Sequence, residues 1–131
     1  MKKIVIVGSA KLQNDIKYWK QKFSNDNYLV LDYPKVIEKE KFMEVYPDVH
    51  RAFFENITKT DALFVMNEDK DGKAGYIGAE SFAELAFGLA QKLLYGKNID
   101  LIVLKMPSKE VQCYEEIDLW LKLGWIRLYK E

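Results

Sequence analysis

The sequence has 131 residues, which fits one domain and leaves little room for a second. Nearly half of the residues are hydrophobic and 14% are aromatic, so the chain can bury a substantial core. Its 20 basic and 20 acidic residues cancel, which argues against a dedicated nucleic-acid-binding protein, because such proteins usually carry a basic excess.

No apolar run approaches the roughly 20 residues that are needed to cross a bilayer, so we expect no membrane association. The apolar part of the N-terminus, residues 4–7, is shorter than the roughly 7 to 15 residues of a signal-peptide core, and a first strand is the better interpretation. Cys113 is the only cysteine, so a reducing cytoplasm is the expected location. Because the sequence has no internal repeat, low-complexity segment or linker, we expect one domain over residues 1–131.

Short apolar runs alternate with segments of helical periodicity along the chain. Continuous apolar runs suit strands that are buried on both faces of a parallel sheet, and they predict strands at 3–7, 28–31, 61–66, 101–104 and 125–129. Helices are predicted at 12–23, 36–46, 48–60, 81–94 and 114–123. Pro47 should separate the second helix from the third, which Asp48 should cap, and Gly96 should end the fourth in a left-handed conformation.

Strands that alternate with helices imply right-handed crossovers and a parallel sheet. We therefore predict a doubly wound α/β fold with four or five strands, in the order 2-1-3-4 with the last strand as the fifth. The topological switch then lies between the first and third strands, and ligands bind at such switch points. The loops that follow these strands, at Gly8–Ser9 and residues 67–78, should meet at one crevice.

Ser81 and Glu84 open the helix that follows this second loop, and their spacing has two interpretations. Ser-x-x-Glu before an apolar helix is the pattern of a capping box, a purely structural role. Alternatively, Glu84 is a nucleophile or base at the crevice, because a carboxylate can attack an anomeric carbon and trap the sugar as a glycosyl-enzyme. The positive end of the helix dipole would then keep Glu84 ionised.

Three further acidic residues are candidates for an accessory acid. Glu80 would share a helix face with Glu84 if the helix included it, but with Ser81 as the cap it would lie outside, and we prefer a solvated Glu80. Asp69 and Asp71 belong to a charge run that by default is a solvated loop tip.

Glycines in both loops permit a close approach of the backbone to a ligand. Gly75 and Gly78 flank Tyr76, which offers a stacking face and a hydroxyl, although a turn with a packed tyrosine has the same pattern. The amides after Gly8 and the Ser9 hydroxyl could hold a phosphate or a hydroxyl group. Neither a Walker loop nor a G-x-G-x-x-G motif is present, and no Cys/His/Asp cluster has metal-ligand spacing, so we expect no metal and no cofactor.

The central stretch resembles the nucleoside 2-deoxyribosyltransferase-like superfamily, and in particular its small members. The resemblance rests on D-A-L-F-V-M-N at residues 61–67, G-Y-I-G at 75–78, and Ser81 three residues before Glu84. The first strand running into Gly8-Ser9 also matches, as does a helix with His50 near its start, so about two thirds of the chain is covered.

The resemblance implies a flavodoxin-like or Rossmann-like three-layer fold, a homodimer or higher homo-oligomer, and a nucleophilic glutamate at Glu84. That residue would displace the nucleobase from C1′ of a (deoxy)ribosyl group, and water or a second base would then take the sugar. Gly8 and Ser9 match positions that line the sugar or 5′-phosphate pocket, and Tyr76, Ile77 and Gly78 match the loop over the ligand. The characterised transferases carry an aspartate where this chain has Gly78.

The sequence therefore predicts a nucleoside- or nucleotide-binding domain that cleaves or transfers at the N-glycosidic bond through Glu84, with Gly8, Ser9, Ser81 and the 76–78 loop around the substrate. The alternative is a noncatalytic nucleotide-sensing module of the same fold, in which Glu84 is a helix cap or a ligand for a ribose hydroxyl.

Overall fold

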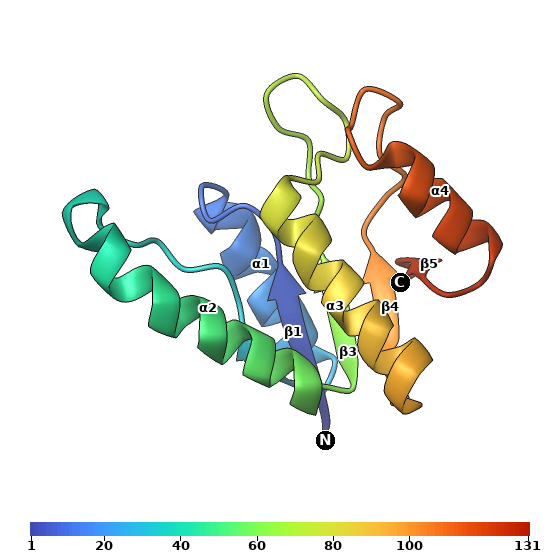
Figure 1. Ribbon diagram of the computed structural model, residues 1–131, viewed down its shortest axis with the longest axis horizontal. Helices are drawn as coiled ribbons and strands as arrows, with labels where there is room; N and C mark the ends of the chain where they lie inside the picture. The colour runs from blue at the N-terminus through green and yellow to red at the C-terminus, as the bar shows by residue number, and fades with distance from the viewer.

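A computed structural model describes all residues 1–131 as an α/β fold built on one parallel sheet (Figure 1). In chain order the elements are β1 (Lys2–Val7), α1 (Gln13–Asn25), β2 (Tyr28–Asp32), a 3-10 turn η1 (Lys39–Lys41), α2 (Phe42–Lys59), β3 (Ala62–Val65), α3 (Ala79–Tyr95), β4 (Asp100–Val103), α4 (Tyr114–Lys122) and β5 (Arg127–Leu128). The strand order is β2-β1-β3-β4-β5 and every pair is parallel, which confirms the predicted sheet and its fifth strand.

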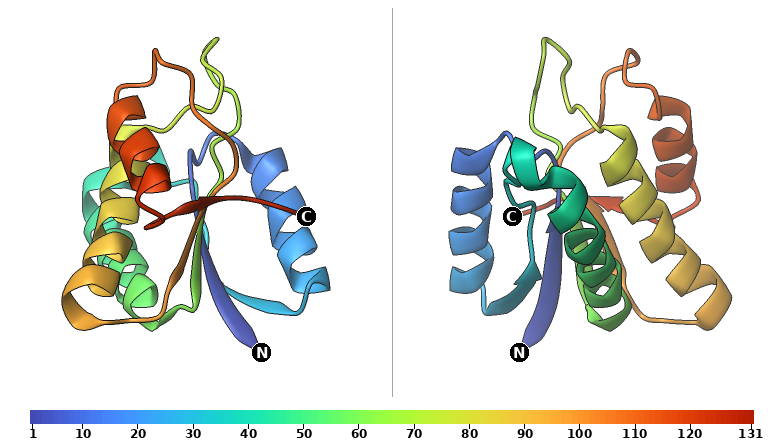
Figure 2. Two further views of the ribbon diagram at one scale, coloured as in Figure 1. Left: turned by 90° about the vertical axis from the view of Figure 1, so that its right-hand side faces the viewer. Right: turned by 60° about the vertical axis from the view of Figure 1, so that its left-hand side comes forward.

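The helices form the two outer layers of a three-layer, Rossmann-like arrangement. The two views of Figure 2 show α2, α3 and α4 on one face of the sheet and α1 on the other. This distribution follows from right-handed crossovers, because only the β1–β2 connection runs toward the β2 edge, whereas the next three run the other way. None of the helices combines the length and the apolar character that are needed to span a membrane.

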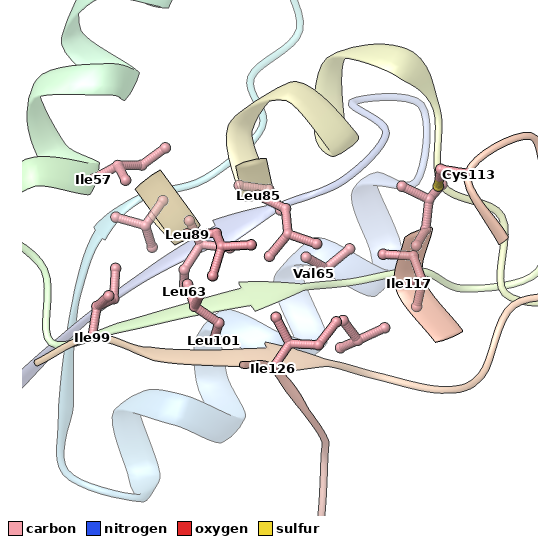
Figure 3. Packing of buried hydrophobic residues seen from close by; sticks show 14 of the residues in the cluster. Ile57, Leu63, Val65, Leu85, Leu89, Ile99, Leu101, Cys113, Ile117 and Ile126 are labelled. Atoms are coloured by element: carbon pink, nitrogen blue, oxygen red, sulfur yellow. The ribbon is translucent and has the colours of Figure 1, made fainter. Parts of the chain in front are cut away.

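Each face of the sheet carries its own hydrophobic core. Side chains alternate along a strand, so β3 sends Leu63 and Val65 into the core under α2, α3 and α4, and Phe64 into the core under α1. Figure 3 shows the first core, where Leu85 and Leu89 of α3 pack over the strands. All four residues of β3 are buried, which explains why this strand reads as one continuous apolar run.

The face that carries only α1 is completed by the C-terminal segment. The ring of Tyr129 lies 5.1 Å from the ring of Trp19 and 5.7 Å from that of Phe64, in edge-on contacts. In Figure 2 this segment crosses the sheet toward α1. A tyrosine after the last strand thus extends the core where the fold has no further helix.

The region around Pro47 differs from the prediction. Pro47 lies inside α2, which is one continuous helix, so the expected helix break and the expected cap at Asp48 are both wrong. Proline cannot donate to the carbonyl four residues earlier, here that of Met43. Met43 is exposed, so water can satisfy this carbonyl, and the buried Phe53 and Ile57 hold the rest of the helix on the sheet. The left-handed Gly96 after α3 is confirmed.

The loop between β3 and α3 is fastened to the loop after β4 by one buried side chain. Asn67 follows β3 and is 1% exposed. Its amide nitrogen donates to the carbonyls of Gly75 (3.1 Å) and Lys105 (2.7 Å), and its amide oxygen accepts from the Lys105 backbone N–H at 3.3 Å. The long glycine-bearing loop is therefore fixed at its base.

Gly75→Ala should destabilise the protein more than Gly72→Ala. Both glycines have positive φ angles, +62° and +76°, so each alanine carries a backbone strain of about 1 kcal/mol. A Cβ at Gly75 would also lie 2.9 Å from the Cα of Pro107, whereas a Cβ at Gly72 meets nothing within 4 Å. Overpacking against backbone should add about 1–3 kcal/mol. Urea unfolding of both variants checks this, and equal losses would show that Gly75 is not tightly packed.

Candidate functional site

A cavity of about 550 Å³ opens at the carboxyl ends of β1 and β3, where the strand order reverses. Its walls come from five segments: the β1–α1 loop, the chain after β2, the first two thirds of α2, the loop before α3 and the start of α3. The lining residues are Gly8, Ser9, Ala10, Lys11, Pro34, Lys35, Val36, Ile37, Phe42, Tyr46, Val49, His50, Phe53, Lys70, Tyr76, Gly78, Ala79, Glu80, Ser81 and Glu84. The prediction that the loops after the first and third strands meet at one crevice is confirmed.

The start of α3 differs from the prediction. Gly78 is the N-cap residue, in an extended conformation, and its carbonyl accepts from the Phe82 N–H at 3.0 Å. Ser81 is the third residue of the helix and no side chain caps it, so the capping box of Ser81 and Glu84 is not formed. Ile77 before the cap is buried in the core against which Phe82 also packs, and apolar residues at these two positions fix where a helix begins.

The earlier helix start changes the setting of both glutamates. Glu80 lies in the first turn, not outside the helix as preferred from the sequence, and therefore shares a face with Glu84 one turn later. Glu84 now lies in the second turn, beyond the free amides of the helix end. The expectation that the helix dipole would keep Glu84 ionised is therefore not supported.

Glu84 is the most unusual side chain of the cavity. It is 4% exposed, makes no hydrogen bond within the chain, and lines the cavity. Burial, reinforced by the charges of Glu80 and Asp32, raises the pKa of Glu84 from 4.5 to about 8. Glu84 is therefore mainly protonated at pH 7.

Three side chains that line the cavity converge. One oxygen each of Glu80 and Glu84 and one ring nitrogen of His50 lie within 4.8 Å of one another. The Tyr46 hydroxyl lies 3.4 Å from a Glu80 oxygen, to which it donates, and Tyr46 stacks on His50 with 5.1 Å between ring centroids. Burial and Glu80 raise the pKa of Tyr46, so the hydroxyl keeps its proton.

Asp32, at the end of β2, organises the neighbouring wall. Its buried carboxylate accepts from the Lys35 ammonium at 2.6 Å, the Asn56 amide at 2.9 Å and the Tyr33 backbone N–H at 2.9 Å. Lys35 lines the cavity, and Asp32 is one of the charges that raise the pKa of Glu84. This residue therefore influences the site without lining it.

The other residues singled out in the sequence divide into two groups. Ser9 lines the cavity with its hydroxyl 3.3 Å from the Lys11 backbone N–H, and Gly8, Tyr76, Gly78 and Ser81 line it as well.

Ile77, Asp69 and Asp71 lie elsewhere. Ile77 is buried in the core and does not line the cavity. Asp69 accepts from the Gly75 N–H and the Lys105 ammonium, and its side chain is 64% exposed, so it fastens the loop. Asp71 is exposed at the loop tip, which agrees with the solvated loop tip expected by default from the sequence. Neither aspartate is placed to act on a ligand in the cavity.

Sequence reasoning missed the contribution of α2. Phe42, Tyr46, His50 and Phe54 follow one another at intervals of four and form a continuous row of ring contacts along this helix. The first three line the cavity. The regular spacing was a visible signal, but Pro47 divides the row and led to the prediction of two helices.

Comparisons of this chain with protein-family models, curated proteins and solved structures find no match. Any functional proposal therefore rests on the fold and the geometry of the cavity, and the family resemblance stays a prediction.

Proposed function

We propose that the protein cleaves or transfers at the N-glycosidic bond of a nucleoside or nucleoside 5′-monophosphate, with Glu84 as the nucleophile. The observation that carries this proposal is a buried glutamate without a hydrogen-bond partner, facing a cavity at the topological switch point, with a second glutamate oxygen within 4.8 Å. Glycosidases that pass through a covalent intermediate place two carboxyl groups at a comparable separation, roughly 5–5.5 Å.

The two glutamates can divide the reaction between them. An ionised Glu84 attacks C1′, the C1′–N bond breaks, and its electron pair leaves with the nucleobase, which takes a proton from solvent water. In the second step Glu80 removes a proton from water, the water oxygen attacks C1′, and the bond to Glu84 breaks. A second nucleobase in place of water gives transfer. Neither step requires a metal or an organic cofactor.

The cavity walls suit a nucleotide in both charge and shape. Lys11, Lys35 and Lys70 lie around the cavity and can attract an anionic group. Tyr76 offers an aromatic face, whereas Tyr46 is itself stacked between Phe42, with 5.0 Å between centroids, and His50, with 5.1 Å. These features favour a ligand that carries both an aromatic ring and a negative charge.

A noncatalytic nucleotide-sensing module is the second candidate, and the raised pKa of Glu84 favours it. A neutral carboxyl at pH 7 can donate a hydrogen bond to a ribose hydroxyl, whereas attack on C1′ needs the ionised form. In either case we propose a cytoplasmic location and a homo-oligomer in which a neighbouring copy completes the cavity.

The deciding experiment measures release of free base from a panel of nucleosides and their 5′-monophosphates. Release by the wild-type protein would support N-glycosidic chemistry and identify the substrate class. Thermal stabilisation by the same compounds without any release would favour the sensing module. If the compounds show no base release and give no thermal stabilisation, both candidates are contradicted.

A further inference from the structure

His50, Glu80 and Glu84 form a mixed set of nitrogen and oxygen donors on two facing helices. Glu80 and Glu84 are four residues apart on α3 and share a face, and His50 comes from α2. One donor atom from each lies within 4.8 Å of the other two. No metal-ligand spacing is visible in the sequence, because the histidine and the glutamates lie about 30 residues apart in the chain.

The hydrogen bonding of these side chains supplies a second, independent observation. Buried polar groups nearly always have a partner, yet Glu84 is 4% exposed and has none in the chain. Every fully enclosed side-chain oxygen in the protein has a hydrogen-bond partner. The oxygens of Glu84 have none, so they are not fully enclosed and remain in contact with the cavity. The His50 ring is held by Tyr46 and Phe54, and neither ring nitrogen is hydrogen-bonded. The side chains of His50 and Glu84 thus present to the same cavity unpaired atoms that can bind a metal ion.

We propose that these three residues bind one divalent transition-metal ion, of which Zn²⁺ is the test case. Two carboxylates and one imidazole match the donors that Zn²⁺ and Mn²⁺ accept, whereas Mg²⁺ and Ca²⁺ prefer oxygen donors alone. Three protein ligands leave a further coordination position, and here it faces the cavity.

Closure around an ion requires small movements only. Zn–N and Zn–O bonds of roughly 2.0–2.2 Å place tetrahedral ligand atoms roughly 3.4 Å apart, so the three atoms must approach by about an ångström or somewhat more. Glu80 is exposed and His50 is partly exposed, so both can move toward the buried Glu84. Tyr46 donates to Glu80 and can orient its carboxylate toward the ion.

The proposed metal site can be tested separately from the proposed glycosidic activity, because metal binding is measured without substrate. If that activity is present, the ion competes with it, because a Glu84 that coordinates a cation cannot attack C1′. Zn²⁺ would then inhibit base release, and a chelator would restore it.

The test uses the chain without an affinity tag, treated with a chelator and desalted. Calorimetric titration with Zn²⁺ should show one site per chain. His50→Gln and Glu84→Gln should each weaken the affinity at least about 100-fold, since each removes a ligand. Glu115→Gln, an exposed glutamate in the first turn of α4, is the matched control and should bind as the wild type does.

His50 is the only histidine, so its ring proton NMR signals report on this site alone. Substoichiometric Mn²⁺ should broaden the His50 ring resonances most, together with those of Tyr46 and Phe54, which contact His50, and should broaden the rings on the other face of the sheet less. This measurement needs no variant, so it decides the question even if Glu84→Gln folds poorly. A sharp His50 signal with Mn²⁺, the same Zn²⁺ affinity in His50→Gln, or no Zn²⁺ binding by the wild type would each overturn the proposal.

Discussion

Glu84→Gln should lower the rate of base release at least about 10³-fold, which corresponds to a loss of about 4 kcal/mol of transition-state stabilisation. An amide has nearly the same shape as the carboxyl but cannot form the glycosyl-enzyme. Ligand binding should survive, because Glu84 makes no hydrogen bond that the fold depends on. The measurements are single-turnover base release and thermal stabilisation by the same nucleotide.

The pH dependence of the wild-type rate distinguishes the roles that Glu84 could play. As a nucleophile it acts when ionised, so the rate should rise about tenfold between pH 7 and the plateau above its pKa of about 8. As a general acid it would act when protonated, and the rate would fall over the same range. Glu80→Gln serves as the companion variant, since it keeps Glu84 and removes the proposed general base of the second step. Full turnover by Glu84→Gln would eliminate the catalytic proposal.

Glu84→Gln should also make the protein more stable than the wild type at alkaline pH. Between pH 4.5 and about 8 the folded chain holds a proton on Glu84 that the unfolded chain has released. The free energy of unfolding of the wild type therefore contains a contribution that is complete below pH 4.5 and is lost as the pH rises to about 8. The loss amounts to up to about 1.4 kcal/mol per pH unit and a few kcal/mol in total. Glutamine does not titrate, so the variant lacks this loss.

Urea unfolding of both proteins at pH 5, 7 and 9, with a chelator present, measures the difference. The free energy of unfolding of the variant should increase relative to that of the wild type from pH 5 to 7 and again from pH 7 to 9. Glu115→Gln is again the control, because an exposed glutamate should give a nearly constant difference from the wild type. A constant difference for Glu84→Gln would show that its carboxyl is not perturbed in the folded protein.

The sheet was predictable because its strands obey a simple pattern. Residues 4–7 and 62–65 are buried on both faces, so they are continuously apolar, and the order of alternating elements fixed the topology and the position of the crevice. The helix starts were less predictable, since they depend on tertiary packing. The burial of Ile77 moved the start of α3 ahead of Ser81, and the packing of Phe53 and Ile57 kept α2 continuous through Pro47.

The candidate site was predictable on one side only. Gly8, Ser9, Tyr76, Gly78 and Glu84 lie on the segments that follow the first and third strands, whose convergence is a rule of the fold. Tyr46 and His50 belong to a helix whose angle over the crevice depends on side-chain packing, and periodicity carries no information on that angle. The perturbation of Glu84 also required the structure, because it arises mainly from burial.

The loop that Asn67 fastens makes one wall of the cavity rigid, and the opposite wall is built differently. Asn67 and Asp69 hold the Gly75 backbone from both sides, so the wall that includes Tyr76 and Gly78 is already in place before a ligand arrives. Residues 35–41 opposite contain no strand or α-helix and cross from β2 to α2 through the short turn η1. Backbone amides there should exchange with deuterium faster than those of residues 74–78. The cavity would then adapt to a ligand mainly at the segment before α2, and the amides of this segment should become protected from exchange when a ligand binds.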